Sequence, residues 1–511
     1  MWRKLAGWAI LQAVRGQVRH PLDDPDPTLS QQDVLRRLMQ QAQNTLFGKT
    51  YQFEALSRLP DGQLADAYRQ AVPLFTYEQM YGQWWARIFE GEEQVCWPEH
   101  ISFMAHSSGT TAASAKMIPV SPSMIQQTLM VSRSVLKAAP RLGVDTAALT
   151  RPVISIGAPT ALHSVGDFQC GMFSGIVFGH TPSLLRRWFK PEPEGYNLPD
   201  WESRLHYIVQ HAPQWDIGAI YGFPCWVTPM LERIVTHYGV HNITDIWPNL
   251  NVYAYSGMSI APYREALRQM MGGRPVWIES YVASEGYFAF QMNKESAGMR
   301  LLTNWSVYYE FIPFQEQYFE DNGQPRSDAE AIGLKEVQTG VEYAMVITNN
   351  SGAWRYVLGD TIVFTSVHPP EIRFAGRTAH FINETGERLS LGNLEMAFTE
   401  TCTQTGLKSC DFTVLSHKNG NAFTHIWYVE SVALPDDFTR QLDTVLQRFN
   451  ADYRHIRKSG LLTMPEVKGV APGTFHRYMR DFGRDNGQSK IVRVLKGAQA
   501  GSWLNWLEIN G

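Results

Sequence analysis

Short apolar segments alternate with helical segments between residues 152 and 280, and this alternation narrows the fold more than any other feature of the chain. A strand–helix–strand order lays strands side by side in one sheet and places helices on its faces. The sequence therefore predicts an α/β architecture with partly parallel sheets. Apolar spacing predicts helices over 201–212, 221–239 and 262–271, and strands over 252–255 and 276–280.

The pattern changes after residue 300, where helical signals become sparse. The segments expected as strands there are 308–312, 344–348, 361–364 and 372–375. We expect them to form a β-rich subdomain that completes a large N-terminal domain. A helix is also expected over 122–142, with Ser121 as its cap before Pro122.

A polar segment at 382–387 marks a domain boundary. Beyond it, helices are expected over 393–405 and 438–449, with strands over 412–416 and 425–430. This is a compact α+β pattern. The sequence therefore predicts a large N-terminal domain over 1–383 and a small C-terminal domain over 384–511.

Charge and cysteine content exclude several classes of function. The net charge is -4 and no basic run is present, so a nucleic-acid partner is not expected. The five cysteines form no CxxC pair, which argues against a zinc site or a disulfide framework. We interpret them as reduced thiols of a cytoplasmic protein. Nothing in the sequence sets the oligomeric state, and a monomer is our expectation.

The first residues of the chain, from Trp2 to Val14, are mildly apolar and follow no signal-peptide pattern. No segment approaches the roughly 18 apolar residues of a membrane span. An amphipathic helix is the main interpretation, and peripheral membrane contact is the alternative.

The first motif is a hydroxyl-rich loop at residues 107–111, followed by a lysine. Backbone N–H groups and hydroxyls of such a loop donate to anionic oxygens, and glycine lets the backbone approach phosphate. A Walker A loop is excluded, because serine precedes Ala115 and Lys116 where that motif has glycine. Alone, the loop is equally consistent with a surface turn. Its residues are Ser107, Ser108, Gly109, Thr110, Thr111 and Lys116.

The second motif, residues 281–285, follows an apolar run and is expected at the end of a strand, where α/β sheets bind ligands. Glu285 is a hard oxygen ligand suited to Mg²⁺. Tyr281 is a candidate for stacking on a purine, and Ser284 is a candidate donor to an α-phosphate. A strand end with one solvated glutamate is the plainer alternative.

The third motif, residues 355–360, is expected to turn at Gly359 before a new strand. The Asp360 carboxylate can accept both ribose hydroxyls. An ordinary hairpin turn is the alternative. Three single residues are weaker candidates: Gly257 in a turn, Arg377 near the ribose or phosphate, and Lys490 in the small domain, where a lone lysine is usually solvated.

Motifs of other enzyme classes are missing. The chain has no GxSxG, no HExxH and no GxGxxG with a distant acid, so hydrolase, zinc-protease and dehydrogenase functions lack support.

Together, these segments resemble the Gretchen Hagen family of acyl-acid amido synthetases, and its auxin-responsive bacterial branch looks closest. The family belongs to the adenylate-forming superfamily. The similarity runs almost from end to end. It is carried by 45–51, 107–119, 280–288, 308–313, 354–360, 376–383 and 487–490.

The resemblance implies roles for the candidate residues. The hydroxyl loop would hold AMP phosphate, with Thr110 among the catalytic residues. Ser284 and Glu285 would contact phosphate and Mg²⁺, with Glu285 as the metal ligand. The other implied roles are adenine contact for Tyr281 and Gly257, ribose contact for Asp360 and Arg377, and entry of Lys490 when a mobile small domain closes.

The implied function is an ATP- and Mg²⁺-dependent ligase. It would activate a carboxylic acid as acyl-AMP and form a carbon–nitrogen bond with an amine such as an amino acid. Two alternatives stay open: an acyl-CoA ligase that shares the first half-reaction, and a nucleotide-binding homologue without catalysis. The sequence does not identify the acid or the amine.

Overall fold

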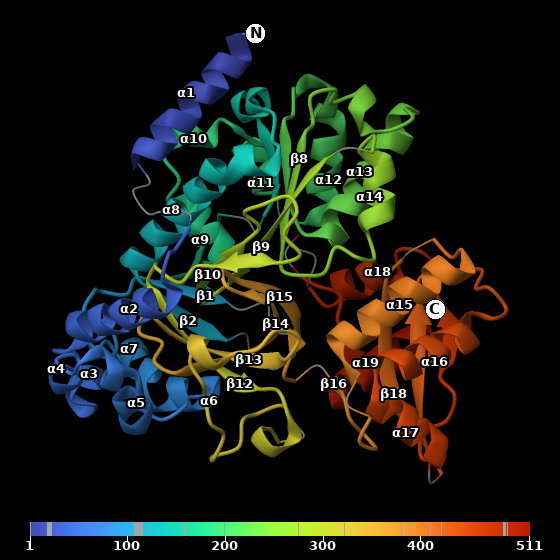
Figure 1. Cartoon of the computed structure of the whole chain (residues 1–511). Helices are drawn as coiled ribbons and strands as arrows, with labels where there is room; N and C mark the ends of the chain where they lie inside the picture. Colours follow the sequence, from blue (N-terminus) through green and yellow to red (C-terminus); the bar gives the residue numbers. More distant parts are fainter. Residues whose placement is uncertain are drawn as a thin grey trace.

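An eleven-stranded sheet runs through the larger part of the molecule (Figure 1). Strands β6, β3, β7, β8 and β9 pair in parallel, and the strands from β9 to β12 pair antiparallel. The structure is a computed structural model. It describes residues 2–17, 23–106, 116–157, 160–198, 200–273, 275–320, 322–379, 381–387, 389–408, 410–420, 422–483, 487 and 489–510.

The strands of this sheet follow the order β12-β13-β14-β15-β11-β10-β9-β8-β7-β3-β6. Their bounds are β3 Val153–Ile156, β6 Phe189–Lys190, β7 Ala219–Gly222, β8 Val252–Ser256, β9 Val276–Ala283, β10 Gly286–Phe290, β11 Met299–Leu301, β12 Val307–Pro313, β13 Glu342–Asn349, β14 Tyr356–Val367 and β15 Pro370–Arg377.

The parallel half of the sheet is covered by helices, as its apolar strands require. Helices α12 (Trp201–His211), α13 (Pro224–Tyr238) and α14 (Arg264–Met270) bury their apolar side chains in one cluster with these strands. The alternation of strands and helices thus produces the α/β architecture that the sequence predicts.

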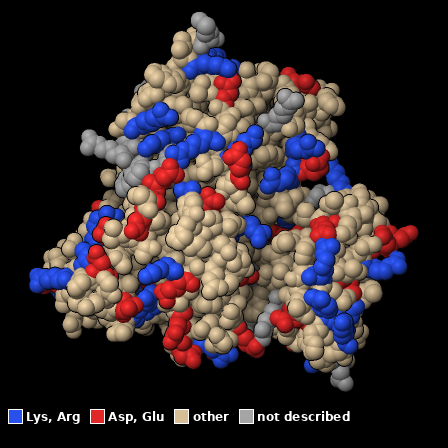
Figure 2. All heavy atoms as spheres, viewed as in Figure 1, with Lys and Arg blue, Asp and Glu red and all other residues tan. Residues whose placement is uncertain are grey.

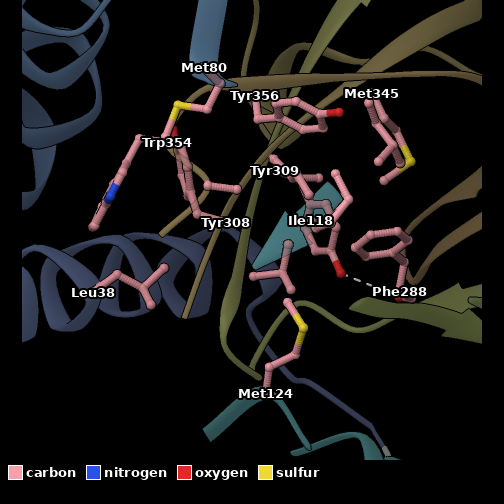
Figure 3. Close-up of a cluster of buried hydrophobic side chains, with 14 of the residues drawn as sticks. Leu38, Met80, Ile118, Met124, Phe288, Tyr308, Tyr309, Met345, Trp354 and Tyr356 are labelled. Carbon is pink, nitrogen blue, oxygen red and sulfur yellow. Dashed lines mark hydrogen bonds between the residues drawn. The ribbon is translucent and has the colours of Figure 1, made fainter. Parts of the chain in front are cut away.

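A second, four-stranded sheet lies beside the first and has the order β2-β1-β5-β4. Its strands are β1 Phe103–His106, β2 Met117–Val120, β4 His163–Val165 and β5 Phe168–Met172. The aromatic and apolar side chains between it, the N-terminal helices and β12–β14 form the largest buried cluster (Figure 3). The buried Tyr309 hydroxyl donates a hydrogen bond there to the Phe288 carbonyl oxygen, 3.4 Å away.

The remaining helices of the larger part are short, apart from α1, α2, α5 and α8. Their bounds are α1 Trp2–Gln17, α2 Pro27–Ala42, α3 Leu46–Thr50, α4 Phe53–Leu56, α5 Asp61–Ala71, α6 Tyr77–Met80, α7 Ala86–Phe89, α8 Pro122–Ala138, α9 Phe173–Gly179, α10 Ser183–Arg186 and α11 Pro193–Tyr196. Single 3₁₀ or π turns lie at Tyr81–Trp85, Ala139–Leu142, Thr146–Thr150, Ala212–Gln214, Ile243–Asp245, Glu316–Tyr318 and Leu334–Glu336.

The C-terminal part carries its own small sheet, ordered β20-β19-β18-β21, with helices around it. Acidic and basic side chains are mixed over the visible face of both parts (Figure 2). The bounds are β16 Phe381–Ile382, β17 Leu389–Ser390, α15 Leu391–Thr405, β18 Phe412–Asn419, β19 Ala422–Val429, α16 Phe438–Phe449, α17 Ala451–Ser459, β20 Glu466–Gly469, α18 Thr474–Asp481, β21 Val494–Leu495 and α19 Gly497–Asn510.

The predicted division after residue 383 falls in the loop between β16 and β17. Residues beyond it form a core of their own around Phe398, Trp427 and Leu442. Others, such as Phe475 and Trp503, share a buried cluster with the parallel half of the large sheet. The division between the domains therefore stays a prediction.

Three local predictions are corrected by the structure. The helix that begins at Pro122, capped by Ser121, ends at Ala138 and continues as a 3₁₀ turn, because Pro140 has no N–H for an α-helical bond. The helix expected from residue 221 begins at Pro224. The strand expected over 276–280 extends to Ala283, whereas the strands predicted after residue 300 do form and complete the large sheet.

Candidate active site

A cavity of about 800 Å³ lies between the face of the large sheet and the C-terminal part. Every predicted site residue that the structure describes lines it: Lys116, Gly257, Tyr281, Ser284, Glu285, Asp360, Arg377 and Lys490. The predicted loop residues Ser107, Ser108, Gly109, Thr110 and Thr111 lie outside the described residues. The second and third motifs and the C-terminal lysine, far apart in the sequence, thus meet at one cavity, while their roles there stay predictions.

Asp360 reaches the cavity from within a strand and not from a turn. Gly359 has a φ of +83° and lies inside β14, where the pairing with β13 shifts register. The expected turn at Gly359 is therefore wrong, since the positive φ that favours glycine serves a β-bulge here. This irregularity leaves the buried Asp360 carboxylate facing the cavity.

Both carboxylate oxygens of Asp360 are held by side chains from other strands of the sheet. Oδ1 lies 3.1 Å from Nε of Arg377, its partner in the β14–β15 register. Oδ2 accepts a hydrogen bond of 2.8 Å from the Tyr281 hydroxyl. Each oxygen has a second lone pair, so the carboxylate is oriented and can still accept from a ligand.

Tyr281 is part of β9 and does not follow it. The strand continues to Ala283, past the end expected at residue 280, so the second motif covers the end of β9 and the connection after it, as the sequence predicts. The Tyr281 ring packs edge-on against Phe288 and Phe374, with ring centroids 5.2 and 5.8 Å away. This packing fixes the hydroxyl that holds Asp360.

Glu285 occupies the tight connection between β9 and β10. Its backbone carbonyl accepts a hydrogen bond of 2.8 Å from Nδ2 of Asn349, and its Oε1 lies 3.5 Å from the Tyr356 hydroxyl. Burial raises the pKa of Glu285 to about 7, although the positive charge of Lys116 acts to lower it. A buried carboxylate of this kind is stabilised when a cation lies beside it.

Ser284 and Lys116 border the same end of the cavity as Glu285. Ser284 Oγ donates to the carbonyl oxygen of His106 over 3.4 Å. The Lys116 ammonium lies 5.0 Å from the centroid of the Tyr77 ring. The alkyl stem and the charge of this lysine are therefore both supported by an aromatic face.

Lys490 lies in the cavity and is half-buried, although a lone lysine in a polar segment is usually solvated. Its ammonium is 5.4 Å from the centroid of the Phe223 ring. A Cβ at Gly257 would lie 2.9 Å from that ring and 3.1 Å from Lys490 Cε, so glycine makes room for both. Burial and the nearby Arg377 charge lower the pKa of Lys490 to about 8.

The segment that carries Lys490 is fixed on both sides of it. The Trp226 indole N–H donates to the Ser489 carbonyl oxygen over 2.8 Å. Three residues after Lys490, Arg493 donates to Oδ1 of Asp411 over 2.8 Å and to the Tyr263 hydroxyl over 3.2 Å. Tyr263 also donates to Asp411. This buried cluster of Tyr263, Asp411 and Arg493, the interdomain triad, joins the C-terminal part to the segment before α14.

Arg355, the first residue of the third motif, does not reach the cavity. It is buried and makes two hydrogen bonds of 3.0 Å to the Glu310 carboxylate on β12. It also donates to the carbonyl oxygens of Arg69 and Val72. Its part in the motif is structural, because it ties β12 and the end of α5 to the start of β14.

Several lining residues escaped the sequence analysis. Phe223 gave no signal, because an aromatic residue before a proline has no distinctive chemistry. Glu279 could have been found, since it lies two residues before Tyr281 on one face of the same strand. Burial raises the pKa of Glu279 and of Glu342, which lies on β13. The charged groups at this end of the cavity are Arg264, Glu279, Glu342, Arg373 and Glu395.

Models of one protein family match most of the chain. The GH3 family N-terminal domain matches residues 23–210, the central domain residues 300–377 and the C-terminal domain residues 392–499. The matched ranges include the hydroxyl-rich loop, Asp360, Arg377 and Lys490.

Curated plant proteins are similar over about half of the chain. A jasmonoyl–L-amino acid synthetase of Nicotiana attenuata, JAR6, is 29% identical over 267 residues, which cover 49% of this chain and 44% of that protein. An indole-3-acetic acid-amido synthetase of Arabidopsis thaliana, GH3.4, is 28% identical over 267 residues, covering 48% and 44%. The match thus spans less than half the length of these relatives.

Solved structures share the fold over nearly the full length. The AtGH3.15 acyl acid amido synthetase in complex with 2,4-DB superposes with a TM-score of 0.73 at 17% identity, covering 99% of this chain and 96% of that chain. A 2-hydroxyisobutyryl-CoA ligase in the postadenylation state gives a TM-score of 0.55 at 14% identity, covering 94% and 92%. These likenesses confirm the predicted α/β fold of the adenylate-forming type, with a small C-terminal α+β part.

Proposed function

This chain belongs to the GH3 family, and on that premise we propose that it is an ATP-dependent acyl-acid amido synthetase, an AMP-forming ligase. One relative is named as a jasmonoyl–L-amino acid synthetase and another as an indole-3-acetic acid-amido synthetase. We accordingly propose a carboxylic acid and an amine, an amino acid in the first instance, as the substrates joined to each other.

One observation carries the proposal: a lysine, a glutamate and an oriented aspartate line the same cavity. Lys490 and Arg377 supply positive charge near Asp360, and Glu285 interacts electrostatically with Lys116, Asp360 and Arg377 in the same cavity. An enzyme that splits ATP at its α-phosphate needs both a ribose acceptor and cations for phosphate oxygens. The spacing of these groups supports such a use.

The first half-reaction would join the acid to the nucleotide. A substrate carboxylate oxygen attacks the α-phosphorus of ATP, the bond to the β-phosphate oxygen breaks, and pyrophosphate leaves. Asp360 would hold the ribose hydroxyls, and the Lys490 ammonium would lie against the negative charge that develops on the phosphate oxygens. Such positioned donors are worth on the order of 3 kcal/mol each.

Mg²⁺ is a proposed cofactor, and Glu285 fits its chemistry. The carboxylate is buried, lines the cavity and has a raised pKa, so a cation bound beside it would offset the cost of burying its charge. Within the described ranges, no three His, Cys, Asp or Glu side chains gather to form a cage. This suits Mg²⁺, which takes one or two carboxylates and completes its shell with phosphate and water. When bound, it would spread the charge of the phosphate oxygens.

In the second half-reaction the amine nitrogen would attack the acyl carbon, AMP would leave with the bonding electrons, and the amine would lose a proton. We propose that residues 384–511 act as a mobile cap that rotates between the two steps, about the loop between β16 and β17. The interdomain triad would then be one contact that such a rotation breaks.

The test is ATP–pyrophosphate exchange with a panel of aryl, indolyl and fatty acids. Exchange that depends on one class of acid supports the proposal, and no exchange with any acid while nucleotide still binds would overturn it. Asp360→Ala should abolish the exchange. An exposed variant, Glu90→Gln, serves as the matched control.

A second measurement distinguishes the two ligases. AMP release is followed with each active acid, in the presence of amino acids or of coenzyme A. Amide formation supports the proposed function, and release that needs coenzyme A without any amine would favour the acyl-CoA ligase. We also propose a cytoplasmic monomer. All five cysteines are free thiols, which suits a reducing compartment.

A further inference from the structure

Helix α1 has a second apolar face that is mostly exposed. Trp2, Leu5 and Trp8 are 69%, 64% and 58% exposed. They follow one another at intervals of three residues, so they lie on one side of the helix. Ala9 and Ala13 are exposed as well and extend the same strip. Large aromatic side chains this exposed, and this close together, mark an interaction surface.

The opposite face of α1 is already packed and fixes the rotation of the helix. Leu11 is 2% exposed, and a Cβ at Gly7 would lie 1.9 Å from the Thr146 carbonyl oxygen. Arg3 pairs with Asp216 at 2.9 Å. The helix therefore cannot rotate to bury its tryptophans without losing the packing of Leu11 and Gly7 and the ion pair of Arg3. Figure 1 shows α1 projecting from one end of the molecule, away from the C-terminal part.

The charges around the strip are basic on the helix itself. The sixteen residues of α1 include Arg3, Lys4 and Arg15 and no acidic residue, although the whole chain has a net charge of -4. Lys4 and Arg15 are eleven positions apart and thus flank Trp8 along one edge. Lys4 lies 3.8 Å from Asp145, both exposed, which is a weak and replaceable pair. Basic side chains also gather on the nearby surface (Figure 2).

We propose that α1 lies flat on a membrane surface that contains anionic lipids, with Trp2, Leu5 and Trp8 in the interface and Lys4 and Arg15 against the headgroups. Indole rings favour this layer, and basic residues at its edge add electrostatic attraction. The helix does not span the bilayer, since its sixteen residues are about 24 Å long and a hydrocarbon core is about 30 Å thick. No described helix meets the length and apolarity of a span.

This arrangement holds the enzyme at the membrane and leaves the cavity free. The cavity residues come from the sheet, from the connections beside it and from the C-terminal part, and none belongs to α1. Membrane docking is therefore independent of the proposed chemistry, and either can fail without the other.

The test is flotation of the full chain with phosphatidylcholine vesicles and with vesicles that also contain about 30% phosphatidylserine. We expect binding to the anionic vesicles that weakens as salt rises. Trp2→Ser with Trp8→Ser should weaken it at least about tenfold, and Lys4→Gln with Arg15→Gln should remove the preference for phosphatidylserine. Val432→Ser with Ile509→Ser removes two side chains that are 82% exposed elsewhere and should bind as the wild type does.

Two results of the flotation assay would overturn the proposal. One is no flotation of the wild-type chain with anionic vesicles, and the other is unchanged flotation of the Trp2→Ser, Trp8→Ser variant. Sedimentation of the chain without lipid tests whether a second copy of the chain covers the exposed face of α1. A dimer that the Trp2→Ser, Trp8→Ser variant dissociates would also overturn membrane docking. Circular dichroism of each variant, which should match the wild type, excludes loss of the fold as the cause.

Discussion

Tyr281 on β9 donates its hydroxyl to Oδ2 of Asp360 on β14, 2.8 Å away, and so joins two sequence motifs that lie 79 positions apart. The contact couples a residue with no charge of its own to the carboxylate proposed to hold ribose. It also explains why the aspartate keeps one orientation within a wide cavity.

Removing this hydroxyl should weaken nucleotide binding without abolishing it. We expect Tyr281→Phe to raise the Kd for AMP about tenfold, because a hydrogen bond to a charged group contributes about 1.5 kcal/mol. Asp360→Ala should cost more, since it removes the acceptor itself. Calorimetric titration with AMP checks both, and equal affinity of Tyr281→Phe and wild type would contradict the orienting role.

Activity should fall at high pH because of Lys490. The folded-state pKa of about 8 lies below the ordinary value of 10.5, so the ammonium that attracts phosphate oxygens is lost as pH rises through 8. We expect kcat/KM for ATP in the exchange assay to decline above that pH. Lys490→Arg keeps its charge and should move the decline to higher pH. A wild-type profile that stays flat to pH 10 would refute this.

The stability of the nucleotide-free protein should depend on Glu285. Its pKa is raised from 4.5 to about 7, so burial favours the protonated form; that stabilisation is complete below pH 4.5 and is lost as pH rises through 7. The stability advantage of Glu285→Gln over wild type should therefore grow as pH rises from 4.5 to 7. Above pH 7 it should stay at its full size, about 3 kcal/mol at most. Thermal unfolding at pH 5 and pH 8 checks it.

The control for that comparison is Glu90→Gln, which replaces an exposed carboxyl and should track the wild type at both values of pH. If Glu285→Gln were no more stabilising at pH 8 than at pH 5, the carboxyl would not carry the cost of burial that we assign to it.

The buried pair of Arg355 and Glu310 predicts a large loss on breaking it. Arg355→Met leaves the Glu310 carboxylate buried without its cation, which costs about 3 to 5 kcal/mol. The midpoint of chemical denaturation should fall accordingly. Arg58→Met breaks the exposed pair with Glu54 and should cost at most about 1 kcal/mol. Comparable shifts in the two variants would argue against a dominant role for burial.

The interdomain triad predicts a defect in catalysis. Tyr263→Phe removes the hydroxyl that donates to Asp411, and we expect the Lys490 segment to be held less firmly. The kcat for ATP–pyrophosphate exchange should fall about tenfold, which corresponds to about 1.4 kcal/mol, while the KM for the acid stays the same. Tyr478→Phe, which loses only a contact with Ser502, is the matched control. Equal kcat in both variants would remove the triad from the mechanism.

Helical elements were the most predictable part of the fold. The helix expected over 438–449 has those bounds in the structure, because its apolar residues Phe438, Leu442, Val445 and Leu446 repeat at the helical spacing and all lie buried on one face. The strands after residue 300 were found for a similar reason. Their membership in the large sheet was not, since pairing between β11 and β15 joins segments about 70 residues apart.

Gly359 shows where local signals run out. A glycine before an aspartate indicates a backbone with positive φ, and a turn is the commonest place for one. In the structure the same φ is used by a bulge within β14. Only the strands on either side decide between the two outcomes, and their pairing is not written in residues 355–360.

Charged site residues behaved in the same way. Arg355 and Asp360 belong to one motif, yet one is buried against Glu310 and the other faces the cavity. Lys490 has a polar sequence around it and still lies against Phe223. The identity of each side chain predicts its chemistry, whereas its partner comes from a distant segment and from packing.

The single sheet that runs from β6 to β12 has a further consequence for how substrates come and go. Glu285, Tyr281 and Asp360 all stand on or beside strands of that one hydrogen-bonded surface. Separating the two ends of the binding groove would break a ladder of backbone hydrogen bonds, whereas movement of the C-terminal part would break side-chain contacts such as those of the interdomain triad and of the apolar cluster around Phe475 and Trp503. We therefore expect the floor of the groove to stay rigid throughout turnover, and the groove to open only by movement of the C-terminal part.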